Sequence, residues 1–202
     1  MNVSLESLRG RLLAEAPALP LNPKRSDYDL DPSNRPAGAV TLTPAAVLLP
    51  IVMRVEPTVL FTERSARLSR HAGQVSFPGG RSEPDDESLI YTALRETREE
   101  TGIAPDFVSV AGFLDAYETG TGFAILPVVG LIREGFALVP DTDEVAEVFE
   151  VPLAFLLDPV NRQRNQGEWK GKVRHFYAFR YHGHYIWGAT AAMLVNFAER
   201  MA

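Results

Sequence analysis

Residues 77–103 constrain the fold of this chain more than any other segment, and they read FPGGRSEPDDESLIYTALRETREETGI. Pro78-Gly79-Gly80 indicates a turn, and Asp86 or Ser88 can cap a following helix that Gly102 ends. Like charges crowded on one helix are unfavourable unless water or a cation offsets them. The segment nevertheless carries seven carboxylates against three arginines: Glu83, Asp85, Asp86, Glu87, Glu96, Glu99 and Glu100, with Arg81, Arg95 and Arg98.

Three of these carboxylates occupy one face of the predicted helix. Glu96, Glu99 and Glu100 stand at i, i+3 and i+4, so their side chains project together. Converging carboxylates are the ligands that a hard divalent cation prefers, which favours Mg²⁺ or Mn²⁺. Arg95 lies four residues before Glu99 and can pair with it and orient it. The alternative is a solvated acidic helix. The opposite face can pack on a sheet through Ile90, Ala93, Leu94 and Thr97.

The same residues resemble a known family. Gly80, Glu87 and the run Arg95-Glu96-Thr97-Arg98-Glu99-Glu100-Thr101-Gly102-Ile103 resemble the Nudix box of the Nudix hydrolases. The spacing from Gly80 is one residue longer than usual, which leaves open whether Asp86 or Glu87 fills the first acidic position. Thr97 stands where an aliphatic residue is usual. The resemblance implies hydrolysis of a nucleoside diphosphate linked to another group, with Glu96, Glu99, Glu100 and the backbone of Gly80 holding the metal.

The segments flanking the box are similar to one branch of that family. LFTERSA at 60–66 and RHAGQVSFPGG at 70–80 look like the signature of coenzyme A pyrophosphatases, and IWGATA at 186–191 resembles their closing segment. The longer box is also typical of that branch. The resemblance implies cleavage of coenzyme A or acyl-coenzyme A to 3′,5′-ADP and (acyl-)4′-phosphopantetheine. A broader ADP-ribose-type pyrophosphatase stays open, as does a non-catalytic nucleotide-sensing module, which would be expected to lose box carboxylates.

Arginines near the box offer partners for the phosphates of such a substrate. Arginine makes charge-assisted hydrogen bonds to phosphate oxygens, although each of these arginines could also form a surface ion pair. The expected substrate-binding residues are Arg64, Arg67, Arg70 and Arg81, with Gly79 in the adjoining turn.

The general base has several candidates. Metal-assisted attack of water on phosphorus needs a group that accepts the proton. A box carboxylate, Glu96 or Glu99, could act as that base. Glu144 and Glu147, in the sequence DTDEVAEV at 141–148, are candidates from outside the box, although a polar strand entrance would account for either of them.

Composition excludes several other classes. The net charge of −6 argues against nucleic-acid or anionic-membrane binding, so a small-molecule substrate is expected. No apolar run reaches eighteen residues, and the N-terminus lacks an apolar signal region. The chain has no cysteine, which agrees with a cytoplasmic location and restricts any metal site to oxygen and imidazole ligands.

The order of predicted elements favours an α+β fold. Residues 1–40 are expected to form a helix (4–16) and an extended arm, and residues 41–202 the Nudix domain. The resemblance implies an α/β/α sandwich with a mixed β-sheet between helices. The arm at 20–44 is a candidate for exchange between subunits of a homodimer. Strands are predicted at 45–54, 58–63, 74–77, 107–117, 123–132, 144–151, 172–180 and 184–187, and further helices at 86–101, 153–157 and 190–201.

Overall fold

The computed structural model describes residues 4–38, 40–67, 72–169 and 171–202. Its α-helices are α1 (Leu5–Arg9), α2 (Leu89–Thr101), α3 (Leu153–Leu157) and α4 (Gly188–Met201), with 3₁₀ turns at Pro32–Asn34, Pro105–Phe107 and Pro159–Asn161. Its strands are β1 (Arg25–Ser26), β2 (Thr43–Val52), β3 (Thr58–Arg64), β4 (Val75–Ser76), β5 (Gly79–Arg81), β6 (Val108–Phe113), β7 (Tyr117–Glu118), β8 (Phe123–Ile132), β9 (Val145–Pro152), β10 (Gln163–Trp169), β11 (Lys172–Tyr181) and β12 (His184–Trp187).

Strand β2 is buried on both faces and divides the hydrophobic core in two. Its alternate residues point to opposite sides of the sheet. Leu48 and Val52 join a cluster with Leu89 and Ala93 of α2. Leu49 and Ile51 belong to the cluster on the other face, which includes residues of α1, α3 and α4. A run of apolar residues without polar alternation is what such a two-sided strand requires.

The sheet that contains β2 mixes parallel and antiparallel pairs. Nine strands of the described residues form it, in the order β1-β7-β8-β2-β3-β4, with β5 on β2, β6 on β8 and β9 on β3. Strand β2 runs parallel to β8 over its whole length and antiparallel to β3 and β5. The predicted α+β sandwich, with a mixed sheet between helices, is therefore confirmed.

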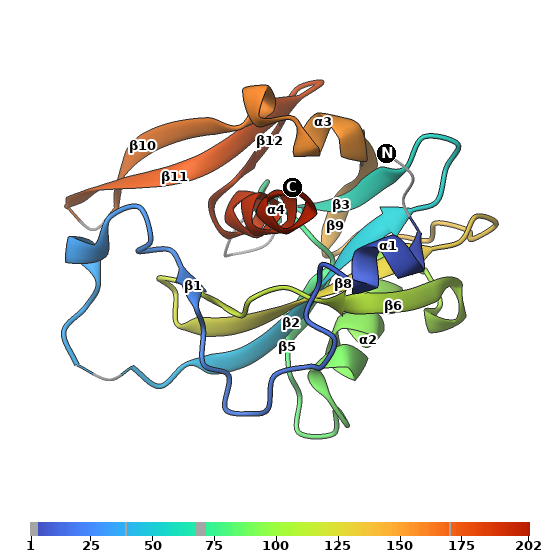
Figure 1. The fold of residues 1–202 in the computed structure, drawn as a ribbon, viewed down its shortest axis with the longest axis horizontal. Helices are drawn as coiled ribbons and strands as arrows, with labels where there is room; N and C mark the ends of the chain where they lie inside the picture. Colours follow the sequence, from blue (N-terminus) through green and yellow to red (C-terminus); the bar gives the residue numbers. More distant parts are fainter. Residues whose placement is uncertain (1–3, 39, 68–71, 170) are drawn as a thin grey trace.

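A second sheet adds a layer beyond the sandwich. Strands β10, β11 and β12 form an antiparallel sheet, and Figure 1 shows helix α4 lying between this sheet and the nine-stranded one. Strand β10 was not predicted. Its sequence QRNQGEW is polar apart from Gly167 and Trp169 and is exposed at nearly every position, so it carries no alternation that would mark a strand. The predicted hairpin of β11 and β12 is confirmed.

The N-terminal helix is shorter than predicted. Ser4 caps it as expected, but α1 ends at Arg9 instead of reaching residue 16. Leu13 instead exchanges two backbone hydrogen bonds with Phe113, one of 3.0 Å in each direction. Backbone pairing of Leu13 with β6 therefore replaces the predicted continuation of the helix. The predicted strand 107–117 is also interrupted, because β6 ends at Phe113 and β7 starts at Tyr117.

The segment expected to be an extended arm packs on the rest of the protein. Strand β1 pairs in parallel with β7. Asp27 accepts hydrogen bonds from the Tyr117 hydroxyl at 2.8 Å and the Gly120 backbone N–H at 2.6 Å, and its carboxylate pairs with Arg174 at 2.6 Å. Tyr28 is buried. The division of the chain at residue 40 and the exchange of this segment in a homodimer stay predictions.

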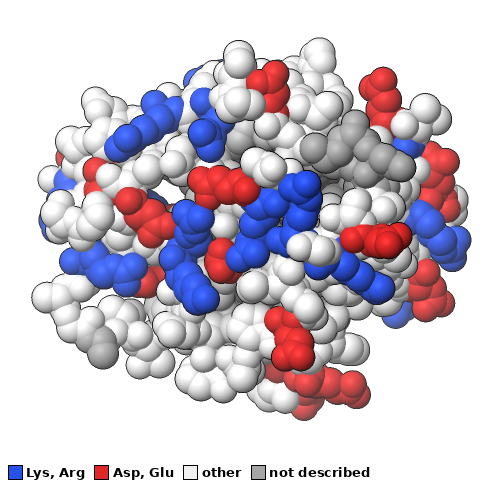
Figure 2. Space-filling model, viewed as in Figure 1, with Lys and Arg blue, Asp and Glu red and all other residues white. Residues whose placement is uncertain are grey.

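Charges on the surface are mixed. On the face shown in Figure 2, basic and acidic side chains alternate over short distances instead of forming one basic surface. Among the described residues, no helix is both long enough and apolar enough to cross a bilayer.

Candidate active site

Helix α2 supplies the acidic side chains of the site, and its ends are defined by local chemistry. Ser88 is the N-cap and accepts a hydrogen bond from the backbone N–H of Tyr91, so of the two predicted caps it is Ser88, and not Asp86, that caps the helix. Gly102 ends the helix in the left-handed conformation at φ 79°, as predicted. Thr97 is fully buried, and its hydroxyl donates to the carbonyl of Ala93 at 2.6 Å. That bond satisfies the hydroxyl and lets threonine replace an aliphatic residue.

The predicted turn at Gly79 and Gly80 is wrong, because both residues pair with β2 as part of strand β5. The two glycines let α2 and β2 approach this strand closely. A Cβ at Gly80 would lie 2.5 Å from the carboxylate carbon of Glu96, and a Cβ at Gly79 would lie 2.4 Å from the carbonyl oxygen of Ala46. Both positions therefore require glycine, for different reasons. Gly80 leaves room for a functional side chain, and Gly79 leaves room for the neighbouring strand. The backbone N–H of Gly79 also donates to the carboxylate of Glu100.

The three glutamates of the helix lie at different depths. Glu100 is 3% exposed, Glu96 is partly buried, and the side chain of Glu99 is 58% exposed. Burial raises the pKa of Glu100 to about 8; Arg64 and the Gly79 N–H oppose the shift, and Glu96 and Glu144 add to it. Burial also raises the pKa of Glu96, against the effect of Arg95. A buried carboxylate that resists ionisation is a position where a cation would be stabilising.

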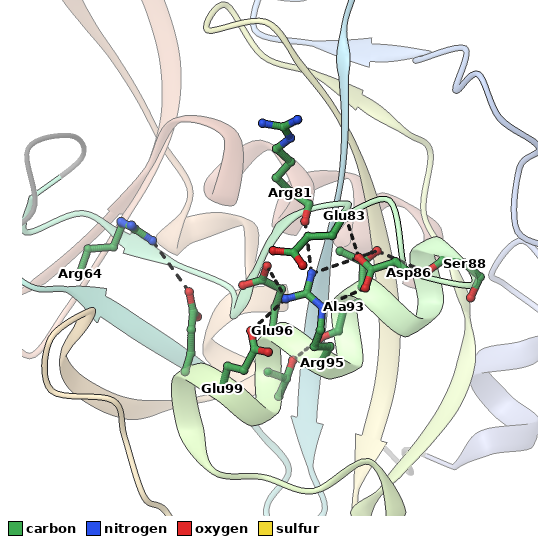
Figure 3. A network of polar contacts seen from close by, with 12 residues as sticks. Arg64, Arg81, Glu83, Asp86, Ser88, Ala93, Arg95, Glu96 and Glu99 are labelled. Carbon is green, nitrogen blue, oxygen red and sulfur yellow. Dashed lines mark hydrogen bonds and ion pairs between the residues drawn. The ribbon is translucent and has the colours of Figure 1, made fainter.

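Arg95 holds Glu96 and Glu99 in place, as Figure 3 shows. Its Nη1 lies 3.0 Å from Glu96 and 2.9 Å from Glu99, and its other donors form a bidentate pair with Asp86 at 2.9 and 3.0 Å. Asp86 also accepts from the Thr92 hydroxyl, and its side chain is only 2% exposed. These bonds from Arg95 hold the pKa of Asp86 well below its ordinary value. Asp86 is thus the acid that anchors Arg95, while Glu87 is exposed.

The two candidate bases from outside the box have different surroundings. Glu144 is exposed just before β9, and its charge contributes to the raised pKa values of both Glu96 and Glu100. Glu147 faces His184 instead, with Glu147 Oε1 3.9 Å from His184 Nε2. Glu144 therefore faces the acidic end of α2 and Glu147 does not.

The four candidate arginines are not equivalent. Arg64 Nη1 lies 3.8 Å from Glu100, and the Nε of Arg64 is buried without a hydrogen-bond partner among the described residues. The side chain of Arg67 is 82% exposed and lies 3.9 Å from Asp143. Arg81 is exposed and its guanidinium points away from the carboxylates in Figure 3, while its backbone carbonyl accepts from Arg95. Arg70 lies outside the described residues.

The donor set fits a hard cation. The ligand candidates are carboxylate oxygens together with backbone at Gly80, which matches the preference of Mg²⁺ and Mn²⁺. Among the described residues, only Glu63, Glu147 and His184 have ligand atoms that all lie within 4.8 Å of one another. The box glutamates form no such set in the described part of the chain, where Glu96 and Glu99 both pair with Arg95.

Several contacts of the site were not predicted from the sequence. The Asp86–Arg95 pair spans nine residues, and the hydroxyl of Thr62 in β3 lies 3.5 Å from Glu100. Neither spacing follows a helix or strand period. The one sequence signal was the longer spacing from Gly80, which made Asp86 as well as Glu87 a candidate for the first acidic position.

Comparison with known proteins places these residues in a family. The NUDIX domain model matches residues 42–170. The protein named "Uncharacterized Nudix hydrolase NudL" from Pectobacterium atrosepticum is 43% identical over 184 residues, which cover 88% of this chain and 92% of the relative. Its namesake from Photorhabdus laumondii is 42% identical over 157 residues, covering 78% and 84%. Among solved structures, a MutT protein from Methanosarcina mazei Go1 is 26% identical, with a TM-score of 0.47 over 60% of this chain and 84% of that chain.

Proposed function

The chain belongs to the Nudix hydrolase family, and from this premise we propose that it hydrolyses the pyrophosphate of coenzyme A or acyl-coenzyme A. The products would be 3′,5′-ADP and 4′-phosphopantetheine or its acyl form. The observation that carries the proposal is the position of Arg64, next to the buried Glu100 and with a buried Nε–H that has no hydrogen-bond partner among the described residues. The Arg64 side chain as a whole is partly exposed, so its guanidinium is suited to bind a phosphate oxygen.

The sequence around Arg64 supports coenzyme A over other nucleotides. Arg64 belongs to LFTERSA, the segment similar to coenzyme A pyrophosphatases. Coenzyme A carries a 3′-phosphate in addition to its pyrophosphate, so it needs more cationic partners than ADP-ribose does. Arg67 and Arg81 are exposed and available for that group.

Nudix hydrolases generally use a divalent metal, and the residues here fit one. Glu96, Glu99, Glu100 and the backbone of Gly80 would hold Mg²⁺ or Mn²⁺, which would neutralise phosphate charge and lower the pKa of a bound water. Arg95, anchored by Asp86, positions two of these carboxylates. Arg64 restrains the third from the neighbouring strand.

The protein supplies a proton acceptor for the attacking water. In the reaction, the water oxygen forms a bond to one phosphorus, the bond from that phosphorus to the bridging oxygen breaks, and the water proton passes to a carboxylate. Glu144 suits this role because it faces Glu96 and Glu100, is exposed to solvent, and has no assigned partner for its carboxylate among the described residues. Glu96 and Glu99 are the other candidates.

A substrate panel tests the proposal. Coenzyme A, acetyl-coenzyme A, dephospho-coenzyme A, ADP-ribose, NADH and a nucleotide sugar are assayed with Mg²⁺ and with Mn²⁺, and products are separated by chromatography. We expect the highest kcat/KM for the coenzyme A forms and roughly a tenfold loss for dephospho-coenzyme A, the cost of one charge-assisted contact. A preference for ADP-ribose would refute the proposed substrate, and equal rates with and without the 3′-phosphate would refute a site for that group.

A further inference from the structure

A second set of metal-ligating side chains lies across the sheet from Glu100. It consists of Glu63 in β3, Glu147 in β9 and His184 in β12. Thr62 reaches toward Glu100, so its strand neighbour Glu63 points to the opposite face. Phe149, two residues after Glu147, lies against the core on the α4 side of the sheet. The set is therefore separate from the Nudix box.

The imidazole of His184 is held between the two carboxylates. Its Nδ1 lies 3.5 Å from Glu63 Oε2, and its Nε2 lies 3.9 Å from Glu147 Oε1. The ring stacks on Phe149, with centroids 3.7 Å apart and planes inclined by 7°. Stacking fixes the ring plane, and each ring nitrogen lies within 4.0 Å of a carboxylate oxygen, so either one could serve as the ligand atom. One ligand atom from each of the three residues lies within 4.8 Å of the others.

The two carboxylates lie on residues that face each other directly. Glu63 and Glu147 are register partners on the antiparallel strands β3 and β9, which run side by side in Figure 1. Like charges directly opposite in a sheet are destabilising. Among the described residues, no lysine or arginine lies within 4.0 Å of either carboxylate. A positive charge between them would remove this repulsion.

We propose that Glu63, Glu147 and His184 bind a transition-metal dication such as Zn²⁺. Imidazole with carboxylates is a ligand set that Zn²⁺ and related ions use, whereas Mg²⁺ selects oxygen alone. Tetrahedral bonds of about 2.1 Å place ligand atoms roughly 3.4 Å apart, close to the Glu63–His184 distance. The side chain of Glu147 is 54% exposed and can rotate to close the remaining gap.

Binding at this position joins the two sheets. Glu63 and Glu147 belong to the nine-stranded sheet and His184 to the three-stranded one. A bound ion would link the two sheets through three coordinate bonds. It would therefore stabilise the folded state over the unfolded one. The site neither contacts nor requires the Nudix glutamates, and its test does not depend on catalysis.

The test uses the full chain in which Glu99→Gln and Glu100→Gln disable the Nudix site. After treatment with a chelator, this double variant is titrated with Zn²⁺ by calorimetry and with Co²⁺ by visible absorption. We expect one ion per chain, d–d bands from Co²⁺ and a higher Tm with Zn²⁺. Mg²⁺ at the same concentration is expected to leave Tm unchanged.

Matched substitutions identify the ligands. Adding His184→Gln or Glu147→Gln should weaken Zn²⁺ binding at least tenfold. Glu147 is largely exposed, so its variant is expected to fold. His182→Asn is the control, because His182 lies at the exposed hairpin tip at φ 44°, which asparagine tolerates. Failure of the double variant to bind Zn²⁺, or equal binding by the Glu147→Gln and His182→Asn variants, would overturn the proposal.

Discussion

Replacing Glu100 by glutamine should remove activity and yet stabilise the metal-free protein at alkaline pH. The pKa of Glu100 is raised from an ordinary 4.5 to about 8 by burial. Below about pH 4.5 the group is protonated in both the folded and unfolded states. As the pH rises from there toward 8, only the unfolded state releases the proton, so the folded state loses stability progressively.

The size of the effect follows from the shift. A change of 3.5 pKa units, from 4.5 to about 8, corresponds to about 5 kcal/mol at 1.36 kcal/mol per unit. Side-chain rotation and water entry reduce the measured value, so we expect Glu100→Gln to raise the free energy of unfolding at pH 8.5 by about 2–5 kcal/mol. Near pH 5 the gain should fall below about 1 kcal/mol, because wild-type Glu100 is then protonated in the folded state.

The assay is urea unfolding in a chelator at pH 5 and pH 8.5, followed by circular dichroism. Glu99→Gln is the matched control, because Glu99 lies on the same helix but its side chain is 58% exposed. It should lose activity with a stability change of about 0.2–1 kcal/mol, the value of an exposed ion pair. Saturating Mg²⁺ should stabilise the wild type and not the Glu100→Gln variant. If the Glu100→Gln variant gains no stability at pH 8.5, or gains as much at pH 5, then Glu100 is not a buried carboxylate that a cation would stabilise.

Four further substitutions separate structural from functional roles. Asp86→Asn breaks the bidentate pair with Arg95 and should cost about 2–3 kcal/mol at pH 7, whereas Asp85→Asn, at an exposed position, should change stability by less than about 0.5 kcal/mol. Because the pKa of Asp86 is lowered in the folded state, the stability that this pair contributes is present above pH 3.8 and is lost in stronger acid, so urea unfolding should show the Asp86→Asn penalty shrinking there. The Cβ of Gly80→Ala would clash only with the flexible carboxylate end of Glu96 and displace it. We therefore expect kcat to fall at least tenfold with little change in Tm. The Cβ of Gly79→Ala would clash with the backbone of Ala46, so this variant should mainly lose stability, seen as a lower Tm. An equal loss of Tm in both glycine variants would contradict this distinction.

Local patterns in the sequence predicted most of the fold. Strand β8 and helix α3 have the predicted bounds, and the caps of α2 at Ser88 and Gly102 follow from residue types at fixed positions. Prediction failed where tertiary pairing decides the outcome. Leu5, Leu8 and Leu12 have helical spacing, yet the chain leaves the helix and Leu13 pairs with Phe113. Strand β10 is held by β11 without any apolar pattern of its own.

The sequence by itself determined which residues share the acidic face of α2, because helical spacing places Glu96, Glu99 and Glu100 together whatever surrounds them. The tertiary structure alone decided how these glutamates differ. Glu100 is buried beside Arg64 and Glu99 is exposed, because strands distant in sequence cover one and not the other. The same holds across the sheet, where Glu63, Glu147 and His184 meet although 121 positions separate the first from the last. Charge and spacing are local properties, whereas depth and proximity arise only when the chain packs.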